Sequence, residues 1–237
     1  MNKILRALAI LSLAATSSTV QAQGVFDLSE ISSKLGMGAA PASATVAAPS
    51  APSAAAKAPA ISAEVLAYKR SPQLSAENLK KFVGGLKQFN PEFGAEFEKG
   101  VANVDLFGMI DQGLSKYGVR TDNLGDVMAI YYLSSWMGAN AREEEPTAAQ
   151  VDGTRKMVHA TLARVPEFAK MSDADKQTGA ESLLLQMFLN EAMLDAVKSQ
   201  PDVAMKVRGE IKTGAKTNAG FEVDKFDLSA TGLVRKK

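Results

Sequence analysis

The chain has 237 residues, of which 46% are hydrophobic and 22% are charged, and its formal net charge is +1. A balance this close to zero gives no electrostatic drive toward nucleic acid or an anionic membrane surface. The chain contains no cysteine, which excludes disulfides, thiolate metal sites and lipid attachment to a cysteine.

The first residues have the three parts of a secretory signal peptide. Lys3 and Arg6 give a basic start, a short apolar stretch follows, and Val-Gln-Ala ending at Ala22 has small residues where signal peptidase reads. We predict that residues 1–22 are the signal peptide, cleaved between Ala22 and Gln23. The apolar stretch is too short for a permanent membrane span. The mature chain, with a net charge of −1, is therefore expected in the periplasm or secreted.

Residues 23–60, which we call the arm, are predicted to be a short amphipathic segment followed by a disordered linker. Either Phe26 or Leu28 falls at helical spacing with Ile31 and Leu35. The candidate partner-binding residues of this segment are Phe26, Leu28, Ile31 and Leu35. Residues 36–59 are rich in Ala, Pro and Ser, so they cannot bury enough apolar surface to fold. At about 3 Å per residue, this linker could reach roughly 70 Å. It is either a plain spacer or a tether that carries the helix to a partner or back onto the rest of the chain.

Residues 61–237, which we call the body, are predicted to form a single all-α domain. Their number suits one hydrophobic core. Apolar residues recur at three- and four-residue intervals through most of the segment, as is typical of amphipathic helices. We therefore expect a compact multi-helix bundle with a central aromatic helix.

Residues that favour the first turn of a helix mark where the helices of the body begin. A side-chain oxygen at that point accepts hydrogen bonds from free backbone amides, and proline fits the first helical position. The expected signals are Ser75, Asn90 with Pro91, Asn103, Asp122, Thr147 with Gln150, Ser172 with Asp175, and Pro201. The helix that starts at Pro201 is expected to end near Thr213.

The C-terminal sequence FEVDKFDLSATGLV has a different character. Phe221 and Val223 alternate with charged neighbours, and the helical spacing disappears. We expect an extended segment laid over the bundle instead of a strand in a sheet, because a lone strand has no partner.

The stretch YGVRTDNLGDVMAIYYLSSWMGAN, residues 117–140, holds the only tryptophan and the start of an uncharged run from Val127 to Ala141. These fifteen residues are fewer than the ~20 needed to cross a bilayer. A helix that is apolar nearly all round is typical of the centre of a bundle. We therefore predict a core helix instead of a binding face, packed against a long helix over residues 172–199.

Polar residues cluster where this aromatic helix begins. One interpretation is helix capping, in which Asp122 accepts from backbone amides, Asp126 favours the helix N-terminus and Arg120 pairs with one of them. The other is a recognition site formed by Arg120 and Asn123 beside an exposed Tyr117. These last three residues are accordingly candidate partner-binding residues.

The sequence offers little for catalysis. His159 is the only histidine, and it is expected to be a half-buried helix residue. Glu143, Glu144 and Glu145 are adjacent and point in different directions, so they are a poor metal site. The pair Gly84-Gly85 lies inside a predicted helix and does not follow a strand, so it is no phosphate-binding loop. We predict a protein that is not an enzyme and has no catalytic, cofactor-binding or metal-binding residues.

Three motifs carry a resemblance to a known family: YKRSPQLSAENLKKFV from Tyr68, YGVRTDNLGDVMAIYYLSSW from Tyr117, and FDLSATGLV near the end. Over about residues 68–234 the chain resembles a family of exported bacterial proteins catalogued as a domain of unknown function. Asp122 stands where that family usually has an asparagine or similar residue, and Leu233 replaces a terminal aromatic residue. The resemblance implies an exported helical domain and carries no activity.

The chain is also similar, more weakly, to periplasmic accessory proteins encoded beside type VI secretion machines, which implies contact with envelope-spanning components. We therefore expect an exported protein that acts by protein–protein contact with a partner in the cell envelope. We expect no nucleic-acid partner and no membrane span in the mature chain. The alternative is a carrier of a small apolar ligand or lipid, since ten methionines could line an adaptable cavity between helices.

Overall fold

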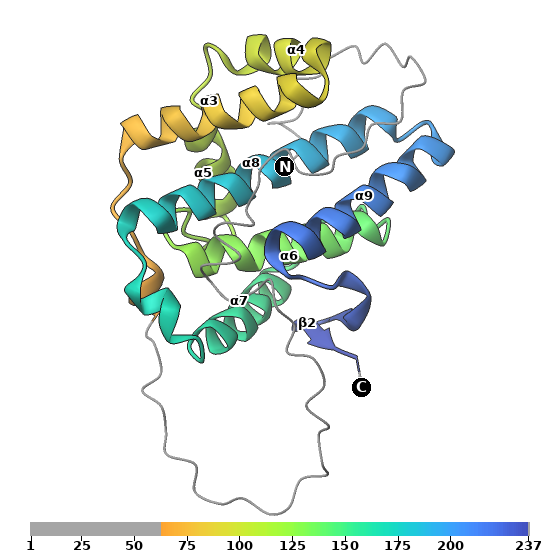
Figure 1. Ribbon diagram of the computed structural model, residues 1–237. Coiled ribbons are helices and arrows are strands. Elements are labelled where there is room, and N and C mark those ends of the chain that lie inside the picture. The colour runs from red at the N-terminus through yellow and green to blue at the C-terminus, as the bar shows by residue number, and fades with distance from the viewer. Residues whose placement is uncertain (1–62, 237) are drawn as a thin grey trace, which may run out of the picture.

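The computed structural model describes residues 63–236 (Figure 1), and the all-α prediction is confirmed. The predicted signal peptide, the arm and its candidate residues lie outside the described residues. The helices and strands are η1 (Ala63–Leu66), α3 (Pro72–Phe89), α4 (Pro91–Val101), α5 (Leu106–Ser115), α6 (Leu124–Ala139), α7 (Ala148–Leu162), η2 (Pro166–Lys170), α8 (Asp173–Val197), α9 (Pro201–Ala219), η3 (Val223–Lys225), β1 (Phe226–Ser229) and β2 (Gly232–Arg235). Within this part of the chain, none of the helices is long and apolar enough to cross a membrane.

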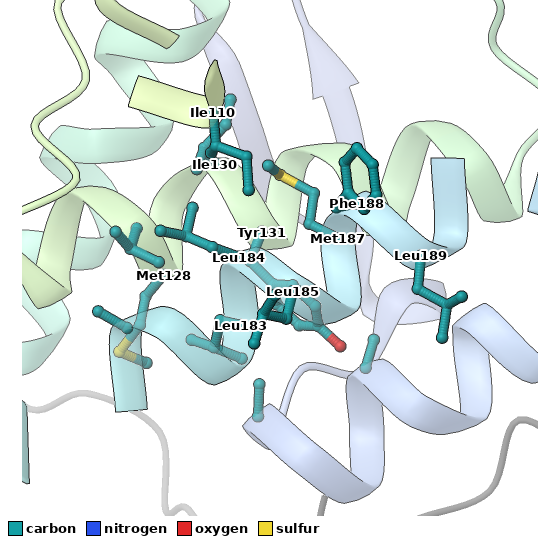
Figure 2. Packing of buried hydrophobic residues seen from close by; sticks show 14 of the residues in the cluster. Ile110, Met128, Ile130, Tyr131, Leu183, Leu184, Leu185, Met187, Phe188 and Leu189 are labelled. Atoms are coloured by element: carbon teal, nitrogen blue, oxygen red, sulfur yellow. The ribbon is translucent and has the colours of Figure 1, made fainter. Parts of the chain in front are cut away.

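Helix α6 is the core helix that the uncharged run predicted. It lies against α7, α8 and α9, and α3 packs on another side of α8 (Figure 1). Tyr131 is completely buried, and Trp136 is only 8% exposed. Figure 2 shows Ile130 and Tyr131 of α6 close to Leu184 of α8. The two apolar helices therefore form the centre of one hydrophobic core.

Several of the predicted helix starts are confirmed. Thr147 and Gln150 form a reciprocal capping box at the start of α7. Asn90 ends α3 and caps α4, where its side chain accepts from the amide of Phe93. Ser172 caps α8, and α9 begins at Pro201.

Three predicted caps are wrong by one to four residues. Ser71, not Ser75, caps α3, because Pro72 already fits the first helical position. Asp105 replaces Asn103 at the start of α5, and Asn123 replaces Asp122 at the start of α6. In each case the predicted cap and the true cap are close together and both have side chains suited to capping. The backbone angles decide which of the two reaches the free amides.

Helix α9 continues beyond its predicted end. Threonine hydroxyls in this region bond back to carbonyls of the preceding turn, as Thr213 does to Gly209, so they remain compatible with a helix. Ala215 and Ala219 are buried, which extends the packed face of the helix. The helix ends at Gly220, which has the left-handed φ of 63° that suits a glycine.

The C-terminal segment was expected to be extended but unpaired, and the pairing part of that prediction is wrong. β1 and β2 form an antiparallel hairpin, with Ser229 opposite Gly232. Gly232 has a φ of 108°, a conformation that glycine adopts readily. The segment therefore turns and supplies its own partner strand.

The hairpin is fixed to the bundle by hydrogen bonds between its backbone and side chains of α6 and α7. The indole Nε1 of Trp136 donates to the carbonyl of Phe226 at 2.9 Å. The amide of Leu233 donates to Oγ1 of Thr154 at 3.1 Å. Two of the polar groups buried on α6 and α7 thus find their partners in the hairpin, which closes that end of the core.

Two adjacent tyrosines of α6 should respond differently to removal of the hydroxyl. The hydroxyl of Tyr131 is buried without a well-formed hydrogen bond among the described residues and has only the Ser135 hydroxyl as a polar neighbour, whereas that of Tyr132 donates to the carbonyl of Ala219 at 2.9 Å. We expect Tyr131→Phe to leave the free energy of unfolding unchanged or to raise it, and Tyr132→Phe to lower it by about 1 kcal/mol. Urea denaturation measures both, and a larger loss from Tyr131→Phe would contradict the assignment.

Candidate functional site

The segment that joins the arm to α3 crosses the body as a well-bonded strap, residues 64–71. Its first half is held by the loop between α5 and α6, residues 116–123. The backbone amide of Tyr68 donates to the carbonyl of Asp122 at 2.9 Å, and the Tyr68 hydroxyl donates to the carbonyl of Thr121 at 2.6 Å. Ala67 pairs with Asn123 in an antiparallel bridge. After the 3-10 turn η1, Ala67 and Tyr68 therefore run as an extended pair of residues bound to the α5–α6 loop.

The second half of the strap is held by the first turns of α8. The side-chain amide of Gln177 accepts from the amide of Ser71 and donates to its carbonyl, both at 2.8 Å. The amide of Lys69 donates to Oδ2 of Asp173 at 3.1 Å. The strap is thus bonded along its backbone from two sides, which gives partners to backbone groups that lie outside a regular helix or sheet.

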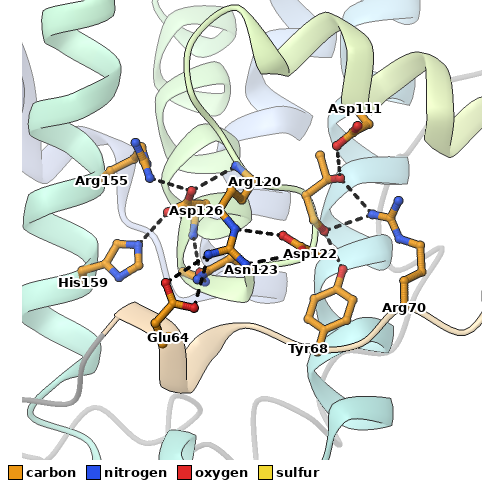
Figure 3. A network of polar contacts seen from close by, with 12 residues as sticks. Glu64, Tyr68, Arg70, Asp111, Arg120, Asp122, Asn123, Asp126, Arg155 and His159 are labelled. Carbon is orange, nitrogen blue, oxygen red and sulfur yellow. Dashed lines mark hydrogen bonds and ion pairs between the residues drawn. The ribbon is translucent and has the colours of Figure 1, made fainter.

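The α5–α6 loop is in turn held by Asp126, in the first turn of α6 (Figure 3). Asp126 is only 2% exposed, and its carboxylate accepts from the backbone amide of Arg120 at 3.0 Å and from Nη2 of Arg155 at 2.7 Å. Nε2 of His159 lies 2.7 Å from its other oxygen. Because a carboxylate only accepts, this nitrogen carries a proton. Asp126 therefore links the loop to α7.

A glycine makes room for this arrangement. A Cβ atom on Gly125 would lie 2.7 Å from Cδ1 of Leu66 and 2.9 Å from Cε1 of His159. Both separations are shorter than carbon atoms tolerate, so the strap and the histidine pack against bare backbone at the start of α6. The strap, α6 and α7 therefore meet at one point.

The charge of Asp126 is stabilised by its neighbours. Burial by itself would raise the pKa of this carboxyl, but the hydrogen bonds from His159 and Arg155 outweigh burial and lower the pKa below its ordinary value. A lowered pKa means that the ionised form contributes stability above the ordinary pKa of about 4 and loses it as the pH falls through the folded-state value.

Acid should therefore remove the contribution of Asp126 to stability. We expect the free energy of unfolding of Asp126→Asn to be lower than that of the parent chain near pH 5, and the difference to shrink as the pH falls toward about 2. Urea denaturation at a series of pH values measures this difference. A difference that stays constant over the range would show that the lowered pKa is wrong.

The three candidate residues of the body do not form one recognition surface. Asn123 is 2% exposed, and its side chain caps α6 by accepting from the amides of Gly125 and Asp126. The Tyr117 hydroxyl donates to Glu145 at 2.9 Å. Each of these side chains is therefore committed to a different part of the fold.

Arg120 lies at the surface, where its side chain is 44% exposed. Its guanidinium pairs with Asp122 at 3.1 Å and with Glu64, at the start of the strap, also at 3.1 Å. The capping interpretation expected Arg120 to pair with Asp122 or Asp126. Its side chain donates to the carboxylate of Asp122, and its backbone amide donates to the carboxylate of Asp126.

The identity of the cap can be tested directly. Asn123→Ala should lower the free energy of unfolding by about 1 kcal/mol or somewhat more, because two amides lose their acceptor. Asp122→Ala removes only an exposed ion pair and should have a much smaller effect. Thermal melting of both variants measures this, and a larger loss from Asp122→Ala would restore Asp122 as the cap.

A second polar cluster, which the sequence analysis missed, lies between α3 and α8. Glu181 is fully buried, and its carboxylate accepts from Ser75 Oγ at 2.5 Å, Asn78 Nδ2 at 2.7 Å and Gln177 Nε2 at 3.0 Å. Nε of Arg70, in the strap, lies 3.7 Å from the same carboxylate. The available signal was a glutamine and a glutamate one turn apart on a long, mostly apolar helix.

Both clusters are bonded internally and to the strap. In the part of the chain that the structure describes, no group of three or more histidine, aspartate or glutamate side chains is placed to hold a metal ion. Arg70 connects the two clusters, because its Nη2 also donates to Thr121 of the α5–α6 loop at 2.9 Å. The strap and the two buried carboxylates beside it, Asp126 and Glu181, are therefore the candidate functional site.

The comparisons with known proteins agree with the resemblance read from the motifs. A family model described as "Family of unknown function (DUF6683)" matches residues 15–236. No curated protein and no solved structure matches the chain. Because the family model spans far more than half of the chain, the protein belongs to this family of unknown function, DUF6683.

Proposed function

We propose that this protein is exported to the bacterial cell envelope and acts without catalysis, by protein–protein contact through its arm. The observation that supports this proposal best is the strap. Its backbone is bonded from two sides, at Tyr68 by the α5–α6 loop and at Ser71 by α8. A fixed anchor at this position is useful if the residues before it bind a partner that must be held at a defined place on the body.

The composition of the arm fits a ligand-like role. Leu28, Ile31 and Leu35 fall on one face of a predicted helix, and a linker of 24 residues separates that helix from the body. An amphipathic helix can place its apolar face in a groove of a partner. A flexible tether with a fixed root keeps the partner within its reach, which raises the local concentration of the body around it.

The buried carboxylates support a structural role for the body. Asp126 and Glu181 are both nearly inaccessible, and their oxygens accept from side chains or amides of neighbouring segments. A general acid or base has to reach a substrate proton within hydrogen-bonding distance. These two groups are instead engaged in joining the strap, α3, α6, α7 and α8.

The proposal is tested by crosslinking in intact cells, followed by affinity capture and mass spectrometry. The full mature chain is compared with a chain that begins at Ile61, which keeps the whole strap. Two double variants of the arm are also compared. The apolar-face variant carries Ile31→Ser and Leu35→Ser, and its control, the polar-face variant, carries Ser32→Ala and Ser33→Ala. We expect an envelope protein to be captured only by the full chain and by the polar-face variant. The purified envelope protein should likewise bind the purified full chain and the polar-face variant, and not the other two.

Other outcomes point elsewhere. Capture that is equal with and without the arm would assign the contact to the body and contradict the proposal. An accessory role in type VI secretion is supported only if the captured partner belongs to that machine. A small apolar ligand that copurifies with the chain, seen by denaturing mass spectrometry, would favour the carrier alternative.

A further inference from the structure

The two halves of the strap depend on different parts of the body. The α5–α6 loop holds the upstream half, residues 64–68, through the contacts of Ala67 and Tyr68. Helix α8 holds the downstream half, residues 69–71, through Asp173 and Gln177. Two side chains cross this division. Nη2 of Arg70, in the downstream half, donates to the carbonyl and the hydroxyl of Thr121 in the loop at 3.1 and 2.9 Å, and Nζ of Lys176 of α8 donates to the carbonyl of Ala67 at 3.3 Å.

The loop that holds the upstream half relies on a single buried carboxylate for its connection to α7. Arg120 donates its backbone amide to Asp126, and Arg155 and His159 of α7 donate to the same carboxylate. The loop has a further contact on its other side, where the Thr121 hydroxyl donates to Asp111 of α5 at 2.6 Å. Asp126 and Thr121 are both only 2% exposed, and Asp126 is the acceptor on which three donors converge, so its loss leaves donors that water cannot easily satisfy.

We propose that the strap is a latch with two stages, in which Asp126 controls the upstream half and Gln177 controls the downstream half. When the contacts of Asp126 are broken, residues 64–68 detach while Ser71 stays bonded to α8. Five more residues then join the arm, and at about 3.4 Å per residue they add roughly 17 Å to its reach. The inference concerns the body alone and stands whether or not the arm binds a partner.

Release of the upstream half would also change the surface of the body. Leu66 and Tyr68 are 1% and 5% exposed in the bound strap. Leu66 covers Gly125 at the start of α6, close to the ring of His159. Detachment would therefore expose two large side chains on the strap and an apolar patch beneath them, a surface that is covered in the latched state.

Substitutions can separate the two stages. Asp126→Asn keeps the size of the side chain but replaces one accepting oxygen with an NH2 group, so a donor faces either His159 or the Arg155 and Arg120 donors, whichever way the amide is turned. Arg155→Gln is the milder variant, since it removes one of the three contacts at the carboxylate. Gln177→Met provides the reciprocal change, because it removes both bonds to Ser71.

The measurement is amide hydrogen exchange by NMR on the full chain, read at Tyr68, at Ser71 and at Leu184 as a core reference. In Asp126→Asn we expect exchange at Tyr68 to accelerate about tenfold or more relative to Leu184, with Ser71 changed less than about threefold. Arg155→Gln should give the same pattern with a smaller factor. Gln177→Met should reverse it, with faster exchange at Ser71 than at Tyr68.

Two results would overturn the latch. If Tyr68 and Ser71 accelerate by the same factor in all the variants, the strap opens as one unit and has no stages. If Tyr68 keeps its exchange rate relative to Leu184 in Asp126→Asn, the carboxylate does not hold the strap. Should Asp126→Asn fail to fold, the same comparison in Arg155→Gln decides between these cases.

Discussion

Replacing Glu181 with alanine is expected to lower the free energy of unfolding by about 3–5 kcal/mol. The carboxylate is fully buried and accepts from Ser75, Asn78 and Gln177, while the guanidinium of Arg70 lies within ion-pairing distance. Its removal takes the acceptor from Asn78 and one of the acceptors from Ser75 and Gln177 in a place that excludes water, leaves Arg70 without this ion-pair partner, and opens a cavity between α3 and α8. Urea denaturation followed by circular dichroism measures the change.

A surface glutamate serves as the control for this prediction. Glu98 is 53% exposed and pairs with Lys87, an arrangement that contributes little because both charges remain solvated. Glu98→Ala should therefore shift the urea midpoint only slightly. If the shift for Glu181→Ala were as small, the cluster between α3 and α8 would not be what holds these helices together.

Replacing Gly153 with alanine is expected to displace the C-terminal hairpin, at a cost of about 3 kcal/mol. A Cβ atom on Gly153 would lie 1.6 Å from the carbonyl oxygen of Thr231, which is backbone and cannot rotate aside. The hairpin would have to move away from α7, which breaks the bond from Leu233 to Thr154. The indole of Trp136 would lose its acceptor on Phe226, so its fluorescence should shift to the red.

The matched control is another helical glycine with open space around it. A Cβ on Gly209, in α9, would meet nothing within 4 Å. Gly209→Ala should therefore stabilise the protein by about 0.5–1 kcal/mol, because alanine loses less backbone entropy on folding. Two substitutions of the same chemical type are thus expected to have opposite signs. Equal effects, or unchanged tryptophan emission in Gly153→Ala, would contradict the close approach of hairpin and helix.

The bundle could be predicted from the sequence because its signals are local. Each helix buries one face or, in α6, nearly all of its surface, and that requirement repeats every three to four residues along the chain. Capping was predictable to within a few residues for the same reason. Which of two neighbouring polar side chains becomes the cap, such as Asp122 or Asn123, depends on backbone angles that a pattern of residue types does not contain.

The candidate site was harder to predict because its partners are far apart in sequence. Asp126 and His159 are 33 residues apart, and Ser75 and Glu181 are 106 apart. His159 was expected to be an ordinary half-buried residue, and Asp126 was expected only to favour the start of its helix. No spacing rule joins such positions, since they meet only after α3, α6, α7 and α8 have packed.

The long separation between Ser75 and Glu181 has a consequence for how the chain reaches its folded state. Helix α3 presents Ser75 and Asn78 toward a partner that follows them by more than a hundred residues, so these two groups lack the carboxylate that they bond in the folded protein until α8 arrives. Helix α3 is therefore expected to dock on α8 late, whatever its own helical tendency. Folding should be slower than is usual for an all-helical protein of this size. The long chain between α3 and α8 must lose conformational entropy before the contacts between these two helices can form.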